Sequence, residues 1–154
     1  MVLPINGKMN RVLIKRVLIH ILFLLYIGIL LRITVFRSGF GFQNLCRNGE
    51  INRKLFESYV PLLKNGDFIR ILYLFVGNII WFVPFGFYLR HFSRVKWKLW
   101  QIWLLGLLFS FAIEFLQYVF GTGISELDDL ILNSLGAWIG ALPGKRRMDE
   151  EKGL

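Results

Sequence analysis

The chain has 154 residues, of which 55% are hydrophobic, and its mean hydropathy is +0.53. A soluble domain of this length cannot bury so much apolar surface in one core, so part of that surface must face lipid. The net charge of +9 could suggest nucleic acid, but the basic residues cluster beside apolar runs, as residues that set membrane topology do. Composition therefore predicts a membrane protein and argues against a nucleic-acid partner.

Apolar runs recur along the chain at residues 17–36, 68–89, 99–120 and 128–142. The first three are long enough to cross a hydrocarbon core of about 30 Å as helices. The fourth is apolar only from Leu130, so it must include the acids before it, thin the bilayer or be sheltered by its neighbours. We expect an all-α, polytopic transmembrane bundle of about four spans that forms a single domain over residues 1–154.

The first run opens like a signal peptide, with basic residues before apolar ones, but it is long for one and no small-residue cleavage site follows. We therefore interpret it as an uncleaved anchor. Lys and Arg counts between the runs predict the orientation: residues 1–16, 90–98 and 143–154 hold four each, residues 37–67 hold five and residues 121–129 hold none. Because cytoplasmic segments are the more basic, both termini are expected in the cytoplasm, and residues 37–67 form an outer loop.

The outer loop is not uniformly polar. Its apolar residues recur at helical spacing between Ile51 and Leu63, which is typical of an amphipathic helix lying on the outer leaflet and bent at Pro61. An ordinary structured loop explains the same residues equally well. Both interpretations stay open at this point.

Polar and small residues form one stripe on each of the last two runs, Ser110, Glu114, Gln117 and Gly121 on the third and Asp129, Asn133, Gly136 and Gly140 on the fourth. In the predicted orientation Glu114 lies about 9 Å below the outer end of its span, Asn133 about 6 Å and Asn78 about 15 Å. The polar groups thus converge on the outer half of the bundle. A binding site there is predicted to include Asn78, Glu114, Gln117, Asp128, Asp129, Asn133 and Arg37.

Each polar residue in a span also has a structural explanation. The amides of Asn78, Gln117 and Asn133 could simply hydrogen-bond neighbouring helices. For Glu114 we favour function, because a carboxyl at this depth is costly unless it is neutralised or paired, for example with Arg32 or Arg37. Three further residues are assigned structural roles: Pro84 should kink its helix, and Gly136 and Gly140 form a GxxxG pair that permits close helix contact or occurs by chance.

Several segments resemble the VanZ-like family of bacterial membrane proteins. Residues 77–87, GNIIWFVPFGF, resemble its GNxxxFxPxGF segment, residues 113–117 its IExxQ segment, and residues 126–136 its DxDDxxxNxxG segment. Glu126 stands where the acidic segment usually opens with aspartate. Arg37 and residues 44–45 resemble the start of the family's R...NLxPF loop, but Cys46 and Arg47 replace its Pro-Phe pair.

The resemblance implies a multi-pass protein of the bacterial cytoplasmic membrane, in a family named for a member that lowers susceptibility to the lipid-tailed glycopeptide teicoplanin. Our leading hypothesis is a non-catalytic envelope factor without cofactor or metal, whose outer polar site engages an amphipathic ligand. Its expected partners are membrane lipids and either a lipid-tailed glycopeptide or a lipid-linked envelope precursor.

Two other functions stay open. One is a metal-assisted enzyme acting on a lipid-linked precursor, in which Glu114, Glu126, Asp128 and Asp129 hold Mg²⁺ or Mn²⁺, although the sequence offers no evident nucleophile. The other is a proton-coupled transporter using Glu114. A chain with four spans and no visible inverted repeat would have to form a homo-oligomer for that task.

Overall fold

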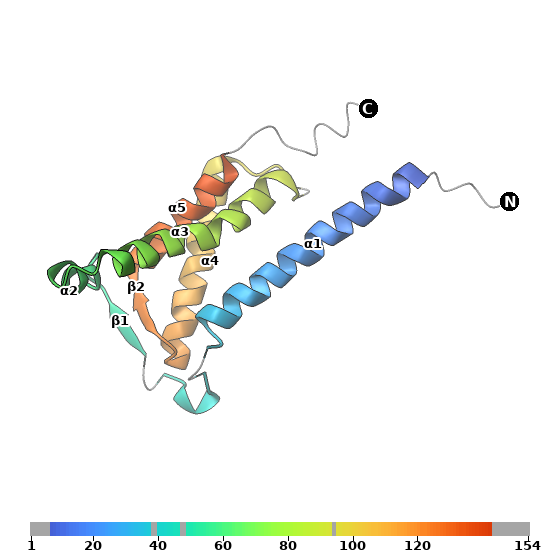
Figure 1. Cartoon of the computed structure of the whole chain (residues 1–154). Helices are drawn as coiled ribbons and strands as arrows, with labels where there is room; N and C mark the ends of the chain where they lie inside the picture. The colour runs from blue at the N-terminus through green and yellow to red at the C-terminus, as the bar shows by residue number, and fades with distance from the viewer. Residues whose placement is uncertain (1–6, 38–39, 47–48, 94, 143–154) are drawn as a thin grey trace.

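The computed structural model describes residues 7–37, 40–46, 49–93 and 95–142. Within them the chain forms α1 (Gly7–Thr34), η1 (Phe42–Asn44), β1 (Glu50–Asn52), α2 (Tyr59–Lys64), α3 (Phe68–His91), α4 (Leu99–Phe120), β2 (Ile124–Glu126) and α5 (Leu127–Ala141) (Figure 1). The all-α prediction is confirmed. Three helices, α1, α3 and α4, are long and apolar enough to cross a membrane.

Helix α5 is shorter than the other three, with fifteen residues. It begins at Leu127, so its first turn includes Asp128 and Asp129, and it packs against both α3 and α4. Eight of its residues are buried, and Asp128 of the first turn is among them. Three possibilities were expected for the short fourth run, and two of them therefore occur together. The helix includes the two acids, and neighbouring helices cover part of it. That α5 crosses the bilayer as a fourth span stays a prediction.

Glycines bring α3 and α5 into backbone contact. A Cβ at Gly136 would collide with the Ile79 carbonyl, and a Cβ at Gly140 with the Val83 carbonyl. A Cβ at Gly86 of α3 would in turn meet the Ala137 carbonyl of α5. The expected close approach at the GxxxG pair is therefore present, and small residues that permit such an approach are typical of tightly packed membrane helices. Pro84 lies within α3, which continues beyond it to His91.

Helix α1 joins the bundle through one side only. The Phe23 and Tyr88 rings stack 3.6 Å apart, and the Tyr26 hydroxyl donates to the Trp81 carbonyl. Farther along, Leu30 is buried in the shared core. The first turns of α1 diverge from α3, α4 and α5 (Figure 1) and expose apolar side chains that suit contact with lipid.

The outer loop is not one amphipathic helix. Residues 50–52 form β1, which pairs in parallel with β2, and Ile51 lies opposite Ser125. Between Ile51 and Leu63 only residues 59–63, which belong to α2, are helical, and Pro61 stands in the first turn of α2, where proline is tolerated. Pairing with β2 gives the backbone N–H and C=O groups of β1 hydrogen-bond partners, which in a helix would come from the helix itself. The interfacial-helix interpretation of residues 51–63 is therefore wrong, and the structured-loop interpretation holds.

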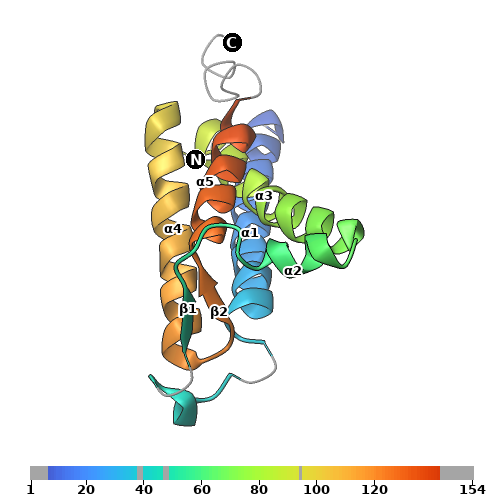
Figure 2. The same ribbon diagram turned by 90° about the vertical axis from the view of Figure 1, so that its left-hand side faces the viewer.

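The two ends of the bundle differ. The start of α1, the α3–α4 connection and the end of α5 share one end, whereas β1, β2 and η1 lie around the other end of α4 (Figures 1 and 2). This arrangement is what an even number of crossings requires. The orientation itself stays a prediction, and the basic residues at 143–154 that support it lie outside the described residues.

The native cysteine allows the orientation to be tested. Cys46 is exposed and lies near the end of α4, where its backbone N–H bonds to the Val119 carbonyl at 2.8 Å. We expect an impermeant maleimide to label the wild-type protein in intact cells, since the basic-residue count puts Cys46 outside. A Cys46→Ser/Val95→Cys variant, with the new thiol at an exposed position between α3 and α4, should be labelled only after permeabilisation. The reverse pattern would mean an inverted topology.

Candidate functional site

The polar stripe of α4 faces α5, as its spacing predicts. Ser110, Glu114 and Gln117 are all buried. The Asn133 amide donates to the Ser110 hydroxyl at 2.9 Å, and that hydroxyl donates to the backbone carbonyl of Asp129 at 3.3 Å. Asn133 and Ser110 therefore join the two helices, which is the structural role left open for Asn133.

Asn78 and Asp129 join α3 to α5. The Asn78 side-chain amide donates to Oδ1 of Asp129. Their positions along the chain placed Asn78 near the midplane and Asp129 at the outer boundary, and a hydrogen bond between them means that these two expected depths cannot both hold. Helix α3 crosses α4 obliquely in both views, and a tilted helix gains less depth per residue than one along the membrane normal (Figures 1 and 2).

Glu114 lies at the junction of α4, β2 and α5. Its Oε2 accepts the Glu126 backbone N–H at 3.0 Å, while its own carbonyl accepts the Ser125 hydroxyl at 2.7 Å. The side chain is 5% exposed. The charged groups that act on its carboxyl are Asp129, Glu126 and Arg37. Two like charges and one opposite charge thus surround a carboxyl that water barely reaches.

The side-chain amide of Gln117 faces the Glu114 carboxyl and can do so in either of two orientations. With its amide nitrogen toward the carboxyl, that nitrogen lies 3.1 Å from Oε2 and 3.2 Å from Oε1 of Glu114. With the amide reversed, the nitrogen donates to the Thr34 carbonyl of α1 at 3.4 Å and the amide oxygen faces the carboxyl. A carboxylate can only accept, so the first orientation matches an ionised Glu114 and the second a protonated one.

Arg37 approaches the cluster from the end of α1. Its Nε donates to the Thr122 carbonyl, and its guanidinium lies against Gly123, where a Cβ would collide with it. Of the two arginines proposed as partners for Glu114, Arg32 instead bonds the Phe36 carbonyl. Arg37 therefore supplies the positive charge of the cluster. We call Asn78, Glu114, Gln117, Asp129 and Arg37 the outer polar cluster.

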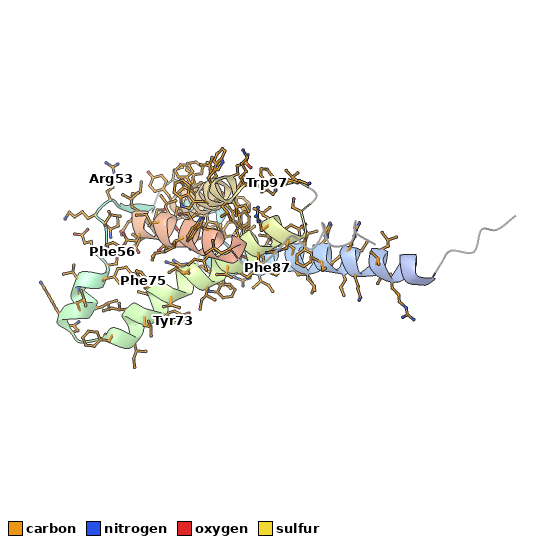
Figure 3. All side chains as sticks on the ribbon, turned by 90° about the horizontal axis from the view of Figure 1, so that it is seen from above. Arg53, Phe56, Tyr73, Phe75, Phe87 and Trp97 are labelled. Carbon is orange, nitrogen blue, oxygen red and sulfur yellow. The ribbon has the colours of Figure 1, made fainter. Side chains whose placement is uncertain are left out.

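Asp128 turns away from this cluster toward the outer loop. Both of its carboxylate oxygens accept the Phe56 backbone N–H at 2.9 Å, and the residue is 1% exposed. Glu126 similarly accepts the Ser58 hydroxyl. Figure 3 places Phe56 at the end of the molecule where α2 lies, away from Trp97. Asp128 thus holds the loop onto α5, a contact between residues 72 positions apart that no local pattern indicates.

Tyr59 covers the loop side of the acids. It is 6% exposed, and burial raises its pKa to about 12, with the nearby Asp129, Asp128 and Glu126 carboxyls acting in the same direction. Its phenol therefore stays protonated at any physiological pH and remains a hydrogen-bond donor.

Removing the Asp128 carboxyl should release the loop. In Asp128→Ala the Phe56 N–H loses its acceptor, which costs about 1–3 kcal/mol where the group is shielded from water. We expect trypsin to cut at the exposed Arg53 and Lys54 several-fold faster in proteoliposomes than it cuts the wild type. Glu50→Ala, which removes an exposed carboxylate from the same loop, is the control and should be cut at the wild-type rate. Equal rates for both variants would show that Asp128 does not hold the loop.

The acidic residues do not converge on a metal geometry. Among the described residues, no group of three or more histidine, cysteine, aspartate or glutamate side chains is arranged to hold a metal ion. Asp128 faces the Phe56 N–H, Glu126 the Ser58 hydroxyl and Asp129 the Asn78 amide. The metal-assisted enzyme therefore gains no support from this part of the chain.

A cluster of aromatic residues beside Arg37 was not predicted from the sequence. The Phe40 ring lies 4.8 Å from Phe36 and 4.7 Å from Phe120, and the Phe42 ring lies 5.5 Å from Phe40 and 5.9 Å from Phe120. Phe42 is 71% exposed although it belongs to this cluster. The recurrence of phenylalanine at positions 36, 40 and 42 was the available signal. We call these four residues the outer aromatic cluster.

Comparison with known proteins identifies the family. The model of the VanZ/LLP1 family matches residues 23–144, well over half of the chain. This range includes every residue of the outer polar cluster and of the outer aromatic cluster. No curated protein and no solved structure gives a match. The chain is therefore a member of the VanZ/LLP1 family, which is linked to glycopeptide resistance.

Proposed function

We propose that the protein is a non-catalytic factor of the bacterial cytoplasmic membrane that lowers susceptibility to lipid-tailed glycopeptides of the teicoplanin type. Family membership supports the link to glycopeptides. The observation that carries the proposal is the proximity of two unlike clusters at one end of the bundle. A largely buried polar cluster with two carboxyls, whose Arg37 is exposed, adjoins an aromatic cluster whose Phe42 is exposed.

This pairing suits an amphiphile. Aromatic side chains at a membrane boundary offer apolar contact area, and Phe42 leaves most of its ring available for an acyl tail. Arg37 links the two clusters, because it follows Phe36 of the aromatic cluster and acts on the Glu114 carboxyl of the polar one. A ligand with a charged head and a hydrocarbon tail could contact the exposed Arg37 and the aromatic cluster at once, whereas a tail-less glycopeptide could contact only Arg37.

The test is expression in a susceptible Gram-positive host. We expect the wild-type protein to raise the minimal inhibitory concentration of teicoplanin several-fold and to leave that of vancomycin, which has no lipid tail, unchanged. Equal protection against both drugs would contradict tail recognition. Protection against neither, at confirmed membrane abundance, would contradict the proposal as a whole.

The aromatic half of the site can be tested separately. Phe42→Ser removes a largely exposed ring and should reduce teicoplanin protection without changing abundance. Phe68→Ser removes a ring of similar exposure, 67%, from the start of α3, and serves as the matched control. If both variants protect as well as the wild type, the tail is not recognised at the outer aromatic cluster.

A further inference from the structure

A groove of about 770 Å³ lies at the opposite end of the bundle, where α3 ends and α4 begins. Two cationic side chains line it, Arg90 of α3 and Lys98 before α4. Trp100 and Trp103 of α4 and Trp138 of α5, with two leucines, make up the rest of its wall. None of the described residues that line it is acidic. The described part of the groove thus combines positive charge with a broad aromatic surface.

Arg90 has capacity left for a ligand. Its Nη1 donates to the Trp97 carbonyl at 2.9 Å, which anchors one side of the guanidinium to the connection between α3 and α4. Its Nε is buried and has no hydrogen-bond partner among the described residues. A buried donor without an acceptor is unfavourable, so the Arg90 guanidinium still has a donor to offer an anion bound in the groove.

The tryptophans indicate where such an acceptor comes from. Trp100, Trp103 and Trp138 are 59%, 43% and 37% exposed, and they lie near the ends of their helices. Tryptophan at such positions lies at the boundary between headgroups and acyl chains, and basic pockets between membrane helices bind anionic headgroups. In the predicted orientation this boundary belongs to the cytoplasmic leaflet.

We propose that the groove binds one anionic phospholipid of the cytoplasmic leaflet, with its phosphate held by Arg90 and Lys98 and its acyl chains lying along Trp100, Trp103 and Trp138. Arginine and lysine both pair with phosphate, arginine through a planar set of donors. This site is separate from the outer polar cluster and does not depend on the proposed role in glycopeptide susceptibility.

The full-length protein in detergent micelles, studied by native mass spectrometry, tests the proposal. Phosphatidylglycerol should form a one-to-one adduct that phosphatidylcholine with the same acyl chains does not form. An Arg90→Gln/Lys98→Gln variant should bind phosphatidylglycerol about 25-fold more weakly, at about fivefold for each cation removed. The matched control is Arg11→Gln/Lys15→Gln, which removes two exposed cations of α1 at the same end of the bundle and should bind like the wild type.

Three results would overturn the proposal. Equal affinities of the two double variants would exclude Arg90 and Lys98 as the headgroup ligands, and equal binding of the two lipids would mean that only acyl chains are recognised. Displacement of the lipid by millimolar glycerol phosphate would show that the groove takes a soluble phosphate. Melting temperatures of both variants monitor folding. If the double variant does not fold, the Lys98→Gln single variant should still lose about fivefold in affinity because Lys98 is exposed.

Discussion

Alanine at Gly136 or Gly140 is expected to destabilise the bundle strongly. At both positions the new Cβ would press on a carbonyl of α3, with the carbonyl carbons of Ile79 and Val83 only 2.9 Å away. A backbone cannot rotate away as a side chain can, so the helices must separate. Overpacking of this kind costs about 1–3 kcal/mol, and separation adds the loss of other packing between α3 and α5.

The measurement is the melting temperature of the purified protein in detergent, with membrane abundance as a second readout. Gly77→Ala is the matched control, because it lies in the middle of α3 and a Cβ there has nothing within 4 Å. Alanine is the better helix former by about 0.5–1 kcal/mol, so this variant should be as stable as the wild type or slightly more stable. Wild-type stability of both Gly136→Ala and Gly140→Ala would mean that α3 and α5 do not touch along this line.

The hydrophobic pattern located α3 and α4 closely, whereas α1 begins at Gly7, ten residues before the expected run at 17–36. The expected runs at 68–89 and 99–120 differ from α3 and α4 by at most two residues, because a span must be apolar over about 20 residues and few other structures meet that condition. The polar stripe on α4 was equally predictable, since helical periodicity alone decides which side chains share a face. Burial of Ser110, Glu114 and Gln117 confirms it.

The outer loop could not be predicted in the same way. Its apolar residues have helical spacing, yet part of the loop forms β1, which pairs with β2. In addition, the Phe56 N–H donates a hydrogen bond to the Asp128 carboxylate, which lies 72 positions later in the sequence. Three-residue strands carry too few side chains to show an alternating pattern, and long-range pairing is decided by tertiary contacts. Asp128 was assigned to a binding site for a similar reason. The sequence shows that a carboxyl lies close to a span, but it does not show which group that carboxyl faces.

Glu114→Gln is expected to separate the charge of the outer polar cluster from its shape. Glutamine has nearly the volume of glutamate and retains an oxygen that can accept the Glu126 N–H, so the variant should fold and reach normal abundance. If Glu114 acts as a carboxylate toward the ligand, teicoplanin protection should fall to the level of cells without the protein. Glu57→Gln, the same change at an exposed pair with Lys54, is the control and should protect fully.

Two further substitutions distinguish a functional carboxylate from a structural hydrogen bond. Glu114→Leu leaves the Glu126 N–H without an acceptor, at a cost of about 1–3 kcal/mol, so both abundance and protection should fall. Gln117→Leu keeps the Glu114 carboxyl but removes the amide that faces it, so protection should fall only in part. Full protection by Glu114→Gln alongside failure of Glu114→Leu would contradict a role for the charge, because the bond to β2 would then account for everything that the residue does.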